Sequence, residues 1–237
     1  MRRMTLIEVL MVILVIAVLI SLLLPAFSRA RQVAQLAVCS SNLKQISTAT
    51  MLYQSNNRGR MPGFLGRRNI AWLGQDGTDS ALPKAKDRAL NTYLDPSRKG
   101  KVGAKCPGDF YYKSLSISAY ERRGSSYVAN RAGLYPGNNS SPSGMEDTGI
   151  GEGTVAGLTY TRSILLDQVQ RPGIMVQLME SGAVDRIEDA NNAPKNHEFH
   201  YNQKWVFGFL DGHVNAYVAQ SGVGNTLDYK TQRSLAQ

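Results

Sequence analysis

The sequence has few of the residue types from which catalytic and metal sites are usually built. Its 237 residues include two cysteines and three histidines. It contains no Gly-x-Ser-x-Gly nucleophile motif, no Walker phosphate-binding loop and no Cys-x-x-Cys pair. We therefore expect that the chain is not an enzyme and needs no cofactor.

Acidic residues are also scarce relative to basic ones. Lys and Arg number 27 against 18 Asp and Glu, which gives a formal net charge of +9, and much of the excess lies in residues 58–68 and 84–105. Aromatic residues make up 8% of the chain, and they are not interleaved with these basic stretches at a stacking spacing. A solvated cationic surface explains the charge, and attraction of anionic lipid, nucleic acid or acidic glycan is the alternative.

Long hydrophobic runs are absent except at the N-terminus. The run from Met4 to Leu24 is 21 residues long, and as a helix it spans about 31 Å, close to the ~30 Å hydrocarbon core of a bilayer. Arg2 and Arg3 precede it, which favours a cytoplasmic N-terminus, although Arg29 and Arg31 follow it. The run therefore predicts a single membrane-spanning helix.

Glu8 lies within this apolar run. A charge at the centre of a membrane helix costs about 2.5–3.5 kcal/mol, and less near the interface, so an intramembrane acid indicates a function and a cationic partner. A cut just before Met4 would place a new α-amino group four residues from Glu8, and a neighbouring subunit's amine could pair with the acid. A cleaved secretory signal is the alternative, but its apolar region is normally about 7–15 residues long and carries no acid. Residues 26–28, Ala-Phe-Ser, match a small-residue cleavage site only weakly.

The helical pattern continues beyond the apolar run. Pro25 is tolerated as a kink, and apolar residues then recur at intervals of three and four to about residue 55. This spacing predicts one helix of about 50 residues whose second half has a single face to bury. Residues 56–59, Asn-Asn-Arg-Gly, end it, because Asn and Gly adopt left-handed geometry at helix C-termini. The face, which we call the helix stripe, consists of Leu36, Cys39, Leu43, Ile46, Thr50 and Tyr53.

Strand signals come late in the chain. Ile174 to Met179 is an apolar, β-rich run opened by Pro172-Gly173, which predicts a central strand. Trp205–Leu210 and Val214–Val218 flank Asp211-Gly212, a pair that favours a type I′ hairpin turn. The pattern alone predicts helix first and strands later.

Residues 5–8, Thr-Leu-Ile-Glu, followed by an apolar helix and Pro25, resemble the processing and methylation segment of type IV pilins and type II secretion pseudopilins. The resemblance implies that a prepilin peptidase cuts between Arg3 and Met4 and methylates the new amine. It also implies that Glu8 neutralises a neighbour's amine during assembly and that Pro25 kinks the helix. The family has glycine before the cut, usually followed by phenylalanine. This chain has Arg3 and Met4 there, so slow or absent cleavage is expected.

Four later segments are similar to a pseudopilin-like group abundant in planctomycete-type bacteria. They are Cys39 to Ile46, Cys106-Pro-Gly-Asp109, Ser126 to Asn130, and His200 with Asp211-Gly212. The last signature in that group is His-x9-Asp-Gly, whereas ten residues separate His200 from Asp211 in this chain. With the N-terminal segment, these pieces cover the chain from end to end.

The resemblance implies an α+β, pilin-like fold in which a long N-terminal helix, membrane-spanning in its first half, packs on an antiparallel β-sheet head. We divide the chain into a basic leader-like segment (1–3), a transmembrane and assembly helix (4–24), its amphipathic continuation (25–55) and an exported head (56–237). The implied function is a structural subunit of a homopolymeric or mixed pilus-like or pseudopilus filament. Its partners would be prepilin peptidase and the inner-membrane machinery of a secretion or pilus system.

The implied location is the bacterial inner membrane, crossed once, with a cytoplasmic N-terminus and a periplasmic or extracellular head. A function that needs no assembly is the alternative. In that case the helix is only an anchor, and basic loops of the head bind nucleic acid or acidic glycan.

Cys39 and Cys106 are an even pair behind an export signal, which permits one disulfide. Cys39 lies on the helix stripe, and Cys106 begins the segment that would lead into the sheet covering it. Closing a loop of this length would contribute on the order of 4 kcal/mol. Two separate buried thiols are the alternative.

Two metal-site hypotheses remain. His197, His200 and His213 lie close in sequence and could bind zinc with Glu198 or Asp211, or they could fasten a loop to the hairpin by ordinary hydrogen bonds. Some pseudopilins that resemble this chain bind calcium in a head loop, for which Asp109, Asp147 and Glu152 are the candidates, although no EF-hand pattern is present.

Overall fold

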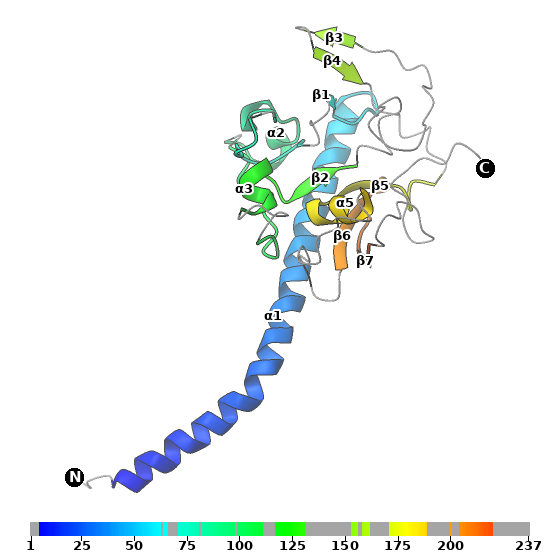
Figure 1. Cartoon of the computed structure of the whole chain (residues 1–237). Coiled ribbons are helices and arrows are strands. Elements are labelled where there is room, and N and C mark those ends of the chain that lie inside the picture. Colours follow the sequence, from blue (N-terminus) through cyan, green and yellow to red (C-terminus); the bar gives the residue numbers. More distant parts are fainter. Residues whose placement is uncertain are drawn as a thin grey trace.

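The largest element of the molecule is helix α1, Leu6–Asn56, a continuous helix of 51 residues. The structure is a computed structural model that describes residues 5–62, 64–65, 71–80, 82–97, 99–110, 117–130, 153–155, 158–161, 171–188, 200 and 204–219. Pro25 lies inside α1 without ending it, since a gentle bend can accommodate both the proline ring and the loss of one backbone hydrogen bond. Figure 1 shows α1 curving as it leaves the rest of the molecule. The prediction of one helix through Pro25 is confirmed over Leu6–Asn56.

The C-terminus of α1 turns left-handed where the sequence predicts it, but not at Asn57. Arg58 has a φ of 56° and Gly59 a φ of 75°, whereas Asn57 has a φ of −122°. The backbone N–H of Gly59 donates to the carbonyl of Gln54 at 2.9 Å. This bond satisfies one of the carbonyls that a helix end leaves without a partner.

A four-stranded antiparallel sheet packs against the second half of α1. Its strands are β2 (Tyr127–Ala129), β5 (Val176–Glu180), β6 (Lys204–Phe209) and β7 (Val214–Val218), in the order β2-β5-β6-β7. Strands β5, β6 and β7 all contact α1. The predicted central strand is β5, which pairs with β2 on one side and β6 on the other. The α+β, pilin-like arrangement of a long helix on an antiparallel sheet is therefore confirmed.

The hairpin between β6 and β7 forms as predicted, but its turn is not type I′. That turn needs positive φ at both Asp211 and Gly212, and only Gly212 has it, at 83°. The N–H of Gly212 donates to the carbonyl of Phe209 at 2.9 Å, and the N–H of Phe209 donates to the carbonyl of His213 at 3.0 Å. This is a three-residue loop in which glycine takes the left-handed bulge position. The predicted turn type is wrong because Leu210 belongs to the loop and not to the strand.

The remaining elements are short. Between α1 and β2 lie η1 (Ala85–Asp87), α2 (Asn91–Leu94) and α3 (Ala119–Arg123), and α5 (Ser181–Glu188) follows β5 and contacts it. A small sheet of β1 (Phe64–Leu65), β4 (Leu158–Thr161) and β3 (Gly153–Val155) is ordered β1-β4-β3. In the view of Figure 1, α2 and α3 lie to the left of α1, and β6 and β7 lie to its right.

The helix stripe is the side of α1 that the head buries. Cys39, Leu43 and Ile46 are fully buried, while Leu36 and Tyr53 are partly buried against the same core. Burying a leucine or isoleucine side chain contributes about 1.5–3 kcal/mol. Large side chains from the sheet complete this core, chiefly Tyr127, Val176, Leu178, Trp205, Val206, Phe207 and Phe209.

Gly208 of β6 allows α1 to approach the sheet closely. A Cβ at this position would lie 2.8 Å from Ser47 Oγ and 3.4 Å from Leu43 Cγ. Real Cβ atoms essentially never come within 3.0 Å of another heavy atom, so a larger residue requires either that Ser47 changes its side-chain conformation or that α1 moves away from β6. The helix-to-sheet distance thus depends on a residue without a side chain.

Gly208→Ala is expected to lower the free energy of unfolding by about 1–3 kcal/mol, because the added methyl group overfills the interface. The same change should cost much less in a Ser47→Ala background, since the oxygen that the methyl would meet is gone. The measurement is a double-mutant cycle from denaturant unfolding of the full-length chain.

Ser47→Ala alone is the control for this cycle. Ser47 Oγ is buried and has no hydrogen-bond partner among the residues that the structure describes, so its removal should change stability by less than about 1 kcal/mol. Strictly additive costs of the two substitutions would contradict the packing argument.

Candidate functional site

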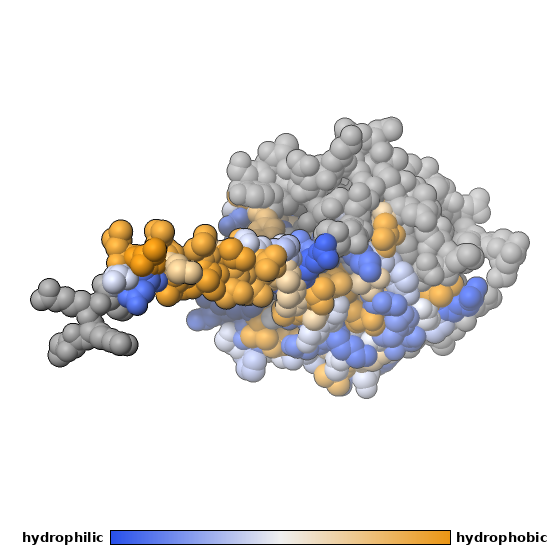
Figure 2. Space-filling model, turned by 90° about the horizontal axis from the view of Figure 1, so that it is seen from below, coloured by the Kyte–Doolittle hydropathy of each residue, from blue (hydrophilic) through white to orange (hydrophobic). Residues whose placement is uncertain are grey.

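The first half of α1 projects from the head with no cover. Every residue from Thr5 to Arg31 is exposed, and Figure 2 shows hydrophobic residues over most of the projecting end on the visible face. Within the described part of the chain, α1 is the one helix long and apolar enough to cross a membrane. A surface this apolar on all sides is typical of a helix that lies in lipid or against other apolar helices.

Glu8 is held by the residue that caps its own helix. Its Oε2 accepts hydrogen bonds from the backbone N–H of Thr5 at 2.8 Å and from the Thr5 hydroxyl at 3.0 Å. Thr5 is therefore part of this site, a role that was not predicted from the sequence. The signal was present, because Thr-x-x-Glu before an apolar run is the pattern of a capping box.

Of the other residues predicted to act in processing and assembly, the structure describes only Pro25. Arg3 and Met4 lie outside the described residues, so the expected cut between them stays a prediction. Pro25 is exposed and lies within α1, consistent with its predicted position in a bent helix.

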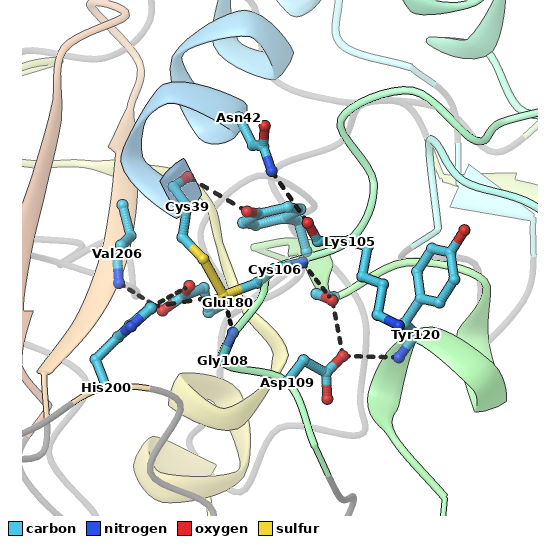
Figure 3. Close-up of a disulfide and its surroundings, with 12 residues drawn as sticks. Cys39, Asn42, Lys105, Cys106, Gly108, Asp109, Tyr120, Glu180, His200 and Val206 are labelled. Atoms are coloured by element: carbon cyan, nitrogen blue, oxygen red, sulfur yellow. Dashed lines mark hydrogen bonds and ion pairs between the residues drawn. A yellow bond between two sulfur atoms is a disulfide. The ribbon is translucent and has the colours of Figure 1, made fainter. Parts of the chain in front are cut away.

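A disulfide joins α1 to the head. Cys39 and Cys106 are bonded, with a Cα–Cα distance of 5.1 Å and a sequence separation of 67, so the predicted pair is present and the alternative of two free thiols is wrong. Figure 3 shows the bond bridging α1 and the loop that carries Cys106. By the loop-entropy relation, this cross-link contributes about 4 kcal/mol to stability.

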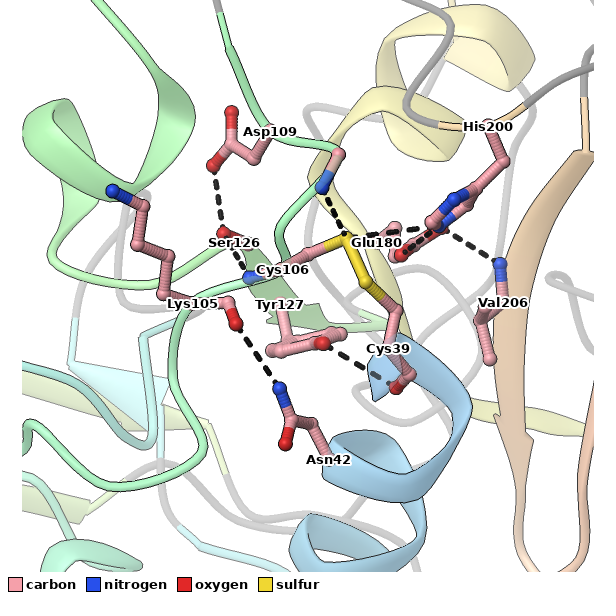
Figure 4. Close-up of polar contacts among 11 residues, drawn as sticks. Cys39, Asn42, Lys105, Cys106, Asp109, Ser126, Tyr127, Glu180, His200 and Val206 are labelled. Atoms are coloured by element: carbon pink, nitrogen blue, oxygen red, sulfur yellow. Dashed lines mark hydrogen bonds and ion pairs between the residues drawn. A yellow bond between two sulfur atoms is a disulfide. The ribbon is translucent and has the colours of Figure 1, made fainter. Parts of the chain in front are cut away.

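Backbone carbonyls on both sides of the disulfide accept hydrogen bonds from side chains. The Tyr127 hydroxyl donates to the carbonyl of Cys39 at 3.3 Å, and Asn42 Nδ2 donates to the carbonyl of Lys105 at 3.0 Å. Figure 4 shows both bonds crossing between α1 and the head. At this point α1 is therefore connected to the head by the disulfide and by at least two hydrogen bonds, one accepted by the carbonyl of Cys39 and one by the carbonyl of Lys105.

Asp109 is engaged as a structural acid. Its carboxylate accepts from the backbone N–H groups of Ala119 at 2.9 Å and Tyr120 at 2.8 Å, and from the Ser126 hydroxyl at 2.7 Å. Burial raises the pKa of Asp109, while these three donors lower it. A carboxylate with three internal donors is not arranged as a calcium ligand. The other two calcium candidates, Asp147 and Glu152, lie outside the described residues.

Glu180 and His200 form a buried pair beside the disulfide. His200 Nε2 lies 2.9 Å from Glu180 Oε1 and 3.6 Å from Cys106 Sγ. Glu180 Oε2 accepts the backbone N–H of Val206 at 2.8 Å. Burial raises the pKa of Glu180, while His200 and the Val206 N–H lower it. Glu180 was not predicted from the sequence: its place at the end of an apolar strand run is visible there, but its pairing with His200 is not.

The three histidines do not act together in the described residues. His213 Nδ1 lies 2.6 Å from Asp211 Oδ1, and the His213 ring stacks on Phe209 with centroids 4.1 Å apart. His200 instead pairs with Glu180, and His197 lies outside the described part. His200 and His213 therefore form separate hydrogen-bonded pairs, and the zinc hypothesis that includes His197 and Glu198 stays a prediction because those two residues lie outside the described part.

Comparison with family models, with curated proteins and with solved structures gives no match.

The pH dependence of stability should show the cost of burying Glu180. Because its folded pKa is raised, the folded chain binds this proton more tightly than the unfolded chain does. The contribution of Glu180 is therefore greatest below the ordinary carboxyl pKa of 4.5 and declines as the pH rises through the folded pKa. The free energy of unfolding of the wild type minus that of Glu180→Gln should fall as the pH is raised from about 4 to 7.

Urea unfolding of the oxidised full-length chain and the variant, followed by tryptophan fluorescence, makes this measurement. Glu180→Gln keeps an oxygen for the Val206 N–H, so the comparison isolates the charge. A difference that grows with pH would show instead that pairing with a protonated His200 outweighs burial.

Proposed function

We propose that the chain is a structural subunit of a pilus-like or pseudopilus filament, held in the membrane by the first half of α1. The observation that supports this most strongly is the continuity of α1. One helix is exposed from Thr5 to Arg31 and is apolar up to Leu24, with Glu8 as the single acid in this run, and its second half then contributes to the core of the head. An anchor alone needs neither the acid nor a rigid connection to the head.

Glu8 supplies the chemistry for subunit recognition. Its partner would be the processed N-terminal amine of a neighbouring subunit, because an acid in an apolar environment needs a cation to compensate its desolvation. Prepilin peptidase would generate that amine, and the inner-membrane machinery of a secretion or pilus system would carry out assembly. The location proposed is the bacterial inner membrane, with a cytoplasmic N-terminus and the head on the far side.

The proposal predicts that the charge of Glu8 is needed for assembly and not for membrane insertion. Glu8→Gln still offers an oxygen to Thr5 but removes the negative charge that would pair with an amine. Its incorporation into filaments beside wild-type subunits should fall at least tenfold, the effect of losing about 1.4 kcal/mol of pairing energy. Subunit content of sheared filaments and of the membrane fraction gives the two readouts.

Thr5→Val is the matched control, because it removes one hydrogen bond to Glu8 and leaves the carboxylate. It should incorporate much better than Glu8→Gln. Normal incorporation of Glu8→Gln would argue for the rival function, a membrane-anchored module that binds nucleic acid or acidic glycan through its basic surface.

A second prediction concerns the residue before the proposed cut. Arg3 places a long charged side chain where the resembled family has glycine, so the Arg3→Gly variant should be cleaved before Met4 to a greater extent than the unaltered chain. Mass spectrometry of the N-terminal peptide from cells with and without a prepilin peptidase measures this. Complete cleavage of the unaltered chain would show that Arg3 does not hinder the peptidase.

A further inference from the structure

Four side chains of the types that bind metals meet in the interior of the head. Cys39 comes from α1, Cys106 from the loop before α3, Glu180 from the end of β5, and His200 from the segment before β6. One donor atom from each lies within 4.8 Å of the others, and all four residues are buried. Figure 3 shows Glu180 and His200 directed toward the disulfide. We call these residues the Cys-Glu-His cluster.

Two sulfurs, one imidazole nitrogen and one carboxylate oxygen are a donor set suited to Zn²⁺. Zinc binds these atoms in a tetrahedron with bonds of about 2.3 Å to sulfur and 2.0–2.2 Å to nitrogen and oxygen. These bond lengths place sulfur and nitrogen ligands about 3.6 Å apart. The distance from Cys106 Sγ to His200 Nε2 is 3.6 Å, so this edge of the tetrahedron is already formed.

We propose that the Cys-Glu-His cluster binds one Zn²⁺ ion when the Cys39–Cys106 disulfide is reduced. An external dithiol breaks the S–S bond by exchange, gives up two electrons and two protons, and becomes a disulfide itself. The two thiols then lose their protons to solvent as two Zn–S bonds form. The proton that lies between His200 Nε2 and Glu180 Oε1 leaves this contact for Nδ1 or for solvent. His200 then contributes the lone pair of Nε2 as a neutral ring protonated at Nδ1, and Glu180 contributes its carboxylate. The site carries a single net negative charge, like a Cys₃His zinc site.

The surrounding backbone already orients two of these ligands. The Val206 N–H holds Glu180 Oε2 at 2.8 Å, which leaves Oε1 directed at the cluster. The backbone N–H of Gly108 lies 3.3 Å from Cys106 Sγ and donates to it, a contact that stabilises a thiolate. Such outer contacts fix ligand orientation in metal sites.

The oxidation state would then decide which bond joins α1 to the head. In the oxidised chain both sulfurs are used by the disulfide, so the metal and the disulfide exclude each other. In the reduced chain zinc would link the same two segments through Cys39 and Cys106. The head would keep its attachment to α1 in either state, whether or not the chain assembles into filaments.

The test uses the full-length chain in detergent, reduced with a phosphine, freed of metal and titrated with Co²⁺ and then Zn²⁺. We expect one equivalent of Co²⁺ with thiolate-to-cobalt absorption and the visible bands of a tetrahedral site, displaced by Zn²⁺. The oxidised chain should show neither. His200→Gln and Glu180→Gln should each weaken Co²⁺ binding at least tenfold, and Cys39→Ser with Cys106→Ser should abolish the thiolate signal.

Two further variants separate a lost ligand from a failed fold. His200→Cys restores a donor and should bind Co²⁺ more tightly than His200→Gln, whereas His213→Gln removes an imidazole outside the cluster and should bind like the wild type. If the reduced chain unfolds without metal, Zn²⁺ should restore protease resistance of the head in the wild type and not in His200→Gln. The proposal is overturned if reduced wild type binds no better than the double serine variant. Co²⁺ binding by His200→Gln or Glu180→Gln as tight as that of the wild type, or no recovery of protease resistance in the wild type with Zn²⁺, would overturn it as well.

Discussion

The burial of one face of α1 against the sheet is the constraint on which the rest of the molecule depends. The helix stripe is apolar enough to organise a core around Cys39, Leu43 and Ile46, which are fully buried. Because a helix is stiff, fixing its second half also fixes the direction in which its first half leaves the head (Figure 1). The apolar surface that projects from the head is therefore a consequence of this packing and needs no separate support.

With hydrophobic packing alone, the attachment of a helix to a sheet is only as strong as the sum of the side-chain contacts along the interface. The disulfide adds a covalent bond that fixes the position of α1 along the sheet. It lies near the point where α1 leaves the core, because Cys39 is the first buried residue of the helix. A force along α1 would reach this bond before it reached Leu43 or Ile46. A cross-link at this position keeps α1 from separating from the sheet at the end of the interface where separation would begin.

The parts of the structure that follow from periodicity were predictable. The spacing of the helix stripe predicts both the length of α1 and its buried face, and the run at 174–179 predicts β5. The prediction of the turn type was wrong because Asp-Gly fits both a two-residue and a three-residue loop, and only the register of β6 with β7 decides between them. Glu180 was not found because its role comes from His200, twenty residues away, and one sequence does not show which distant side chains meet.

The contact between Thr5 and Glu8 bears on how an assembly step of the proposed kind would work. In the single chain the carboxylate already has two donors from Thr5, so an incoming amine would find an acid that is positioned and partly satisfied. Neutral hydrogen bonds contribute less than a charge-assisted one, so a cation could add to them or replace the hydroxyl. The two hydrogen bonds from Thr5 would thus lower the free energy of keeping the Glu8 carboxylate in an apolar helix before a partner arrives. The carboxylate would still keep its negative charge, which favours pairing with an amine. An acid at the same position without a residue like Thr5 before it would gain more from pairing but would be harder to hold in the membrane alone.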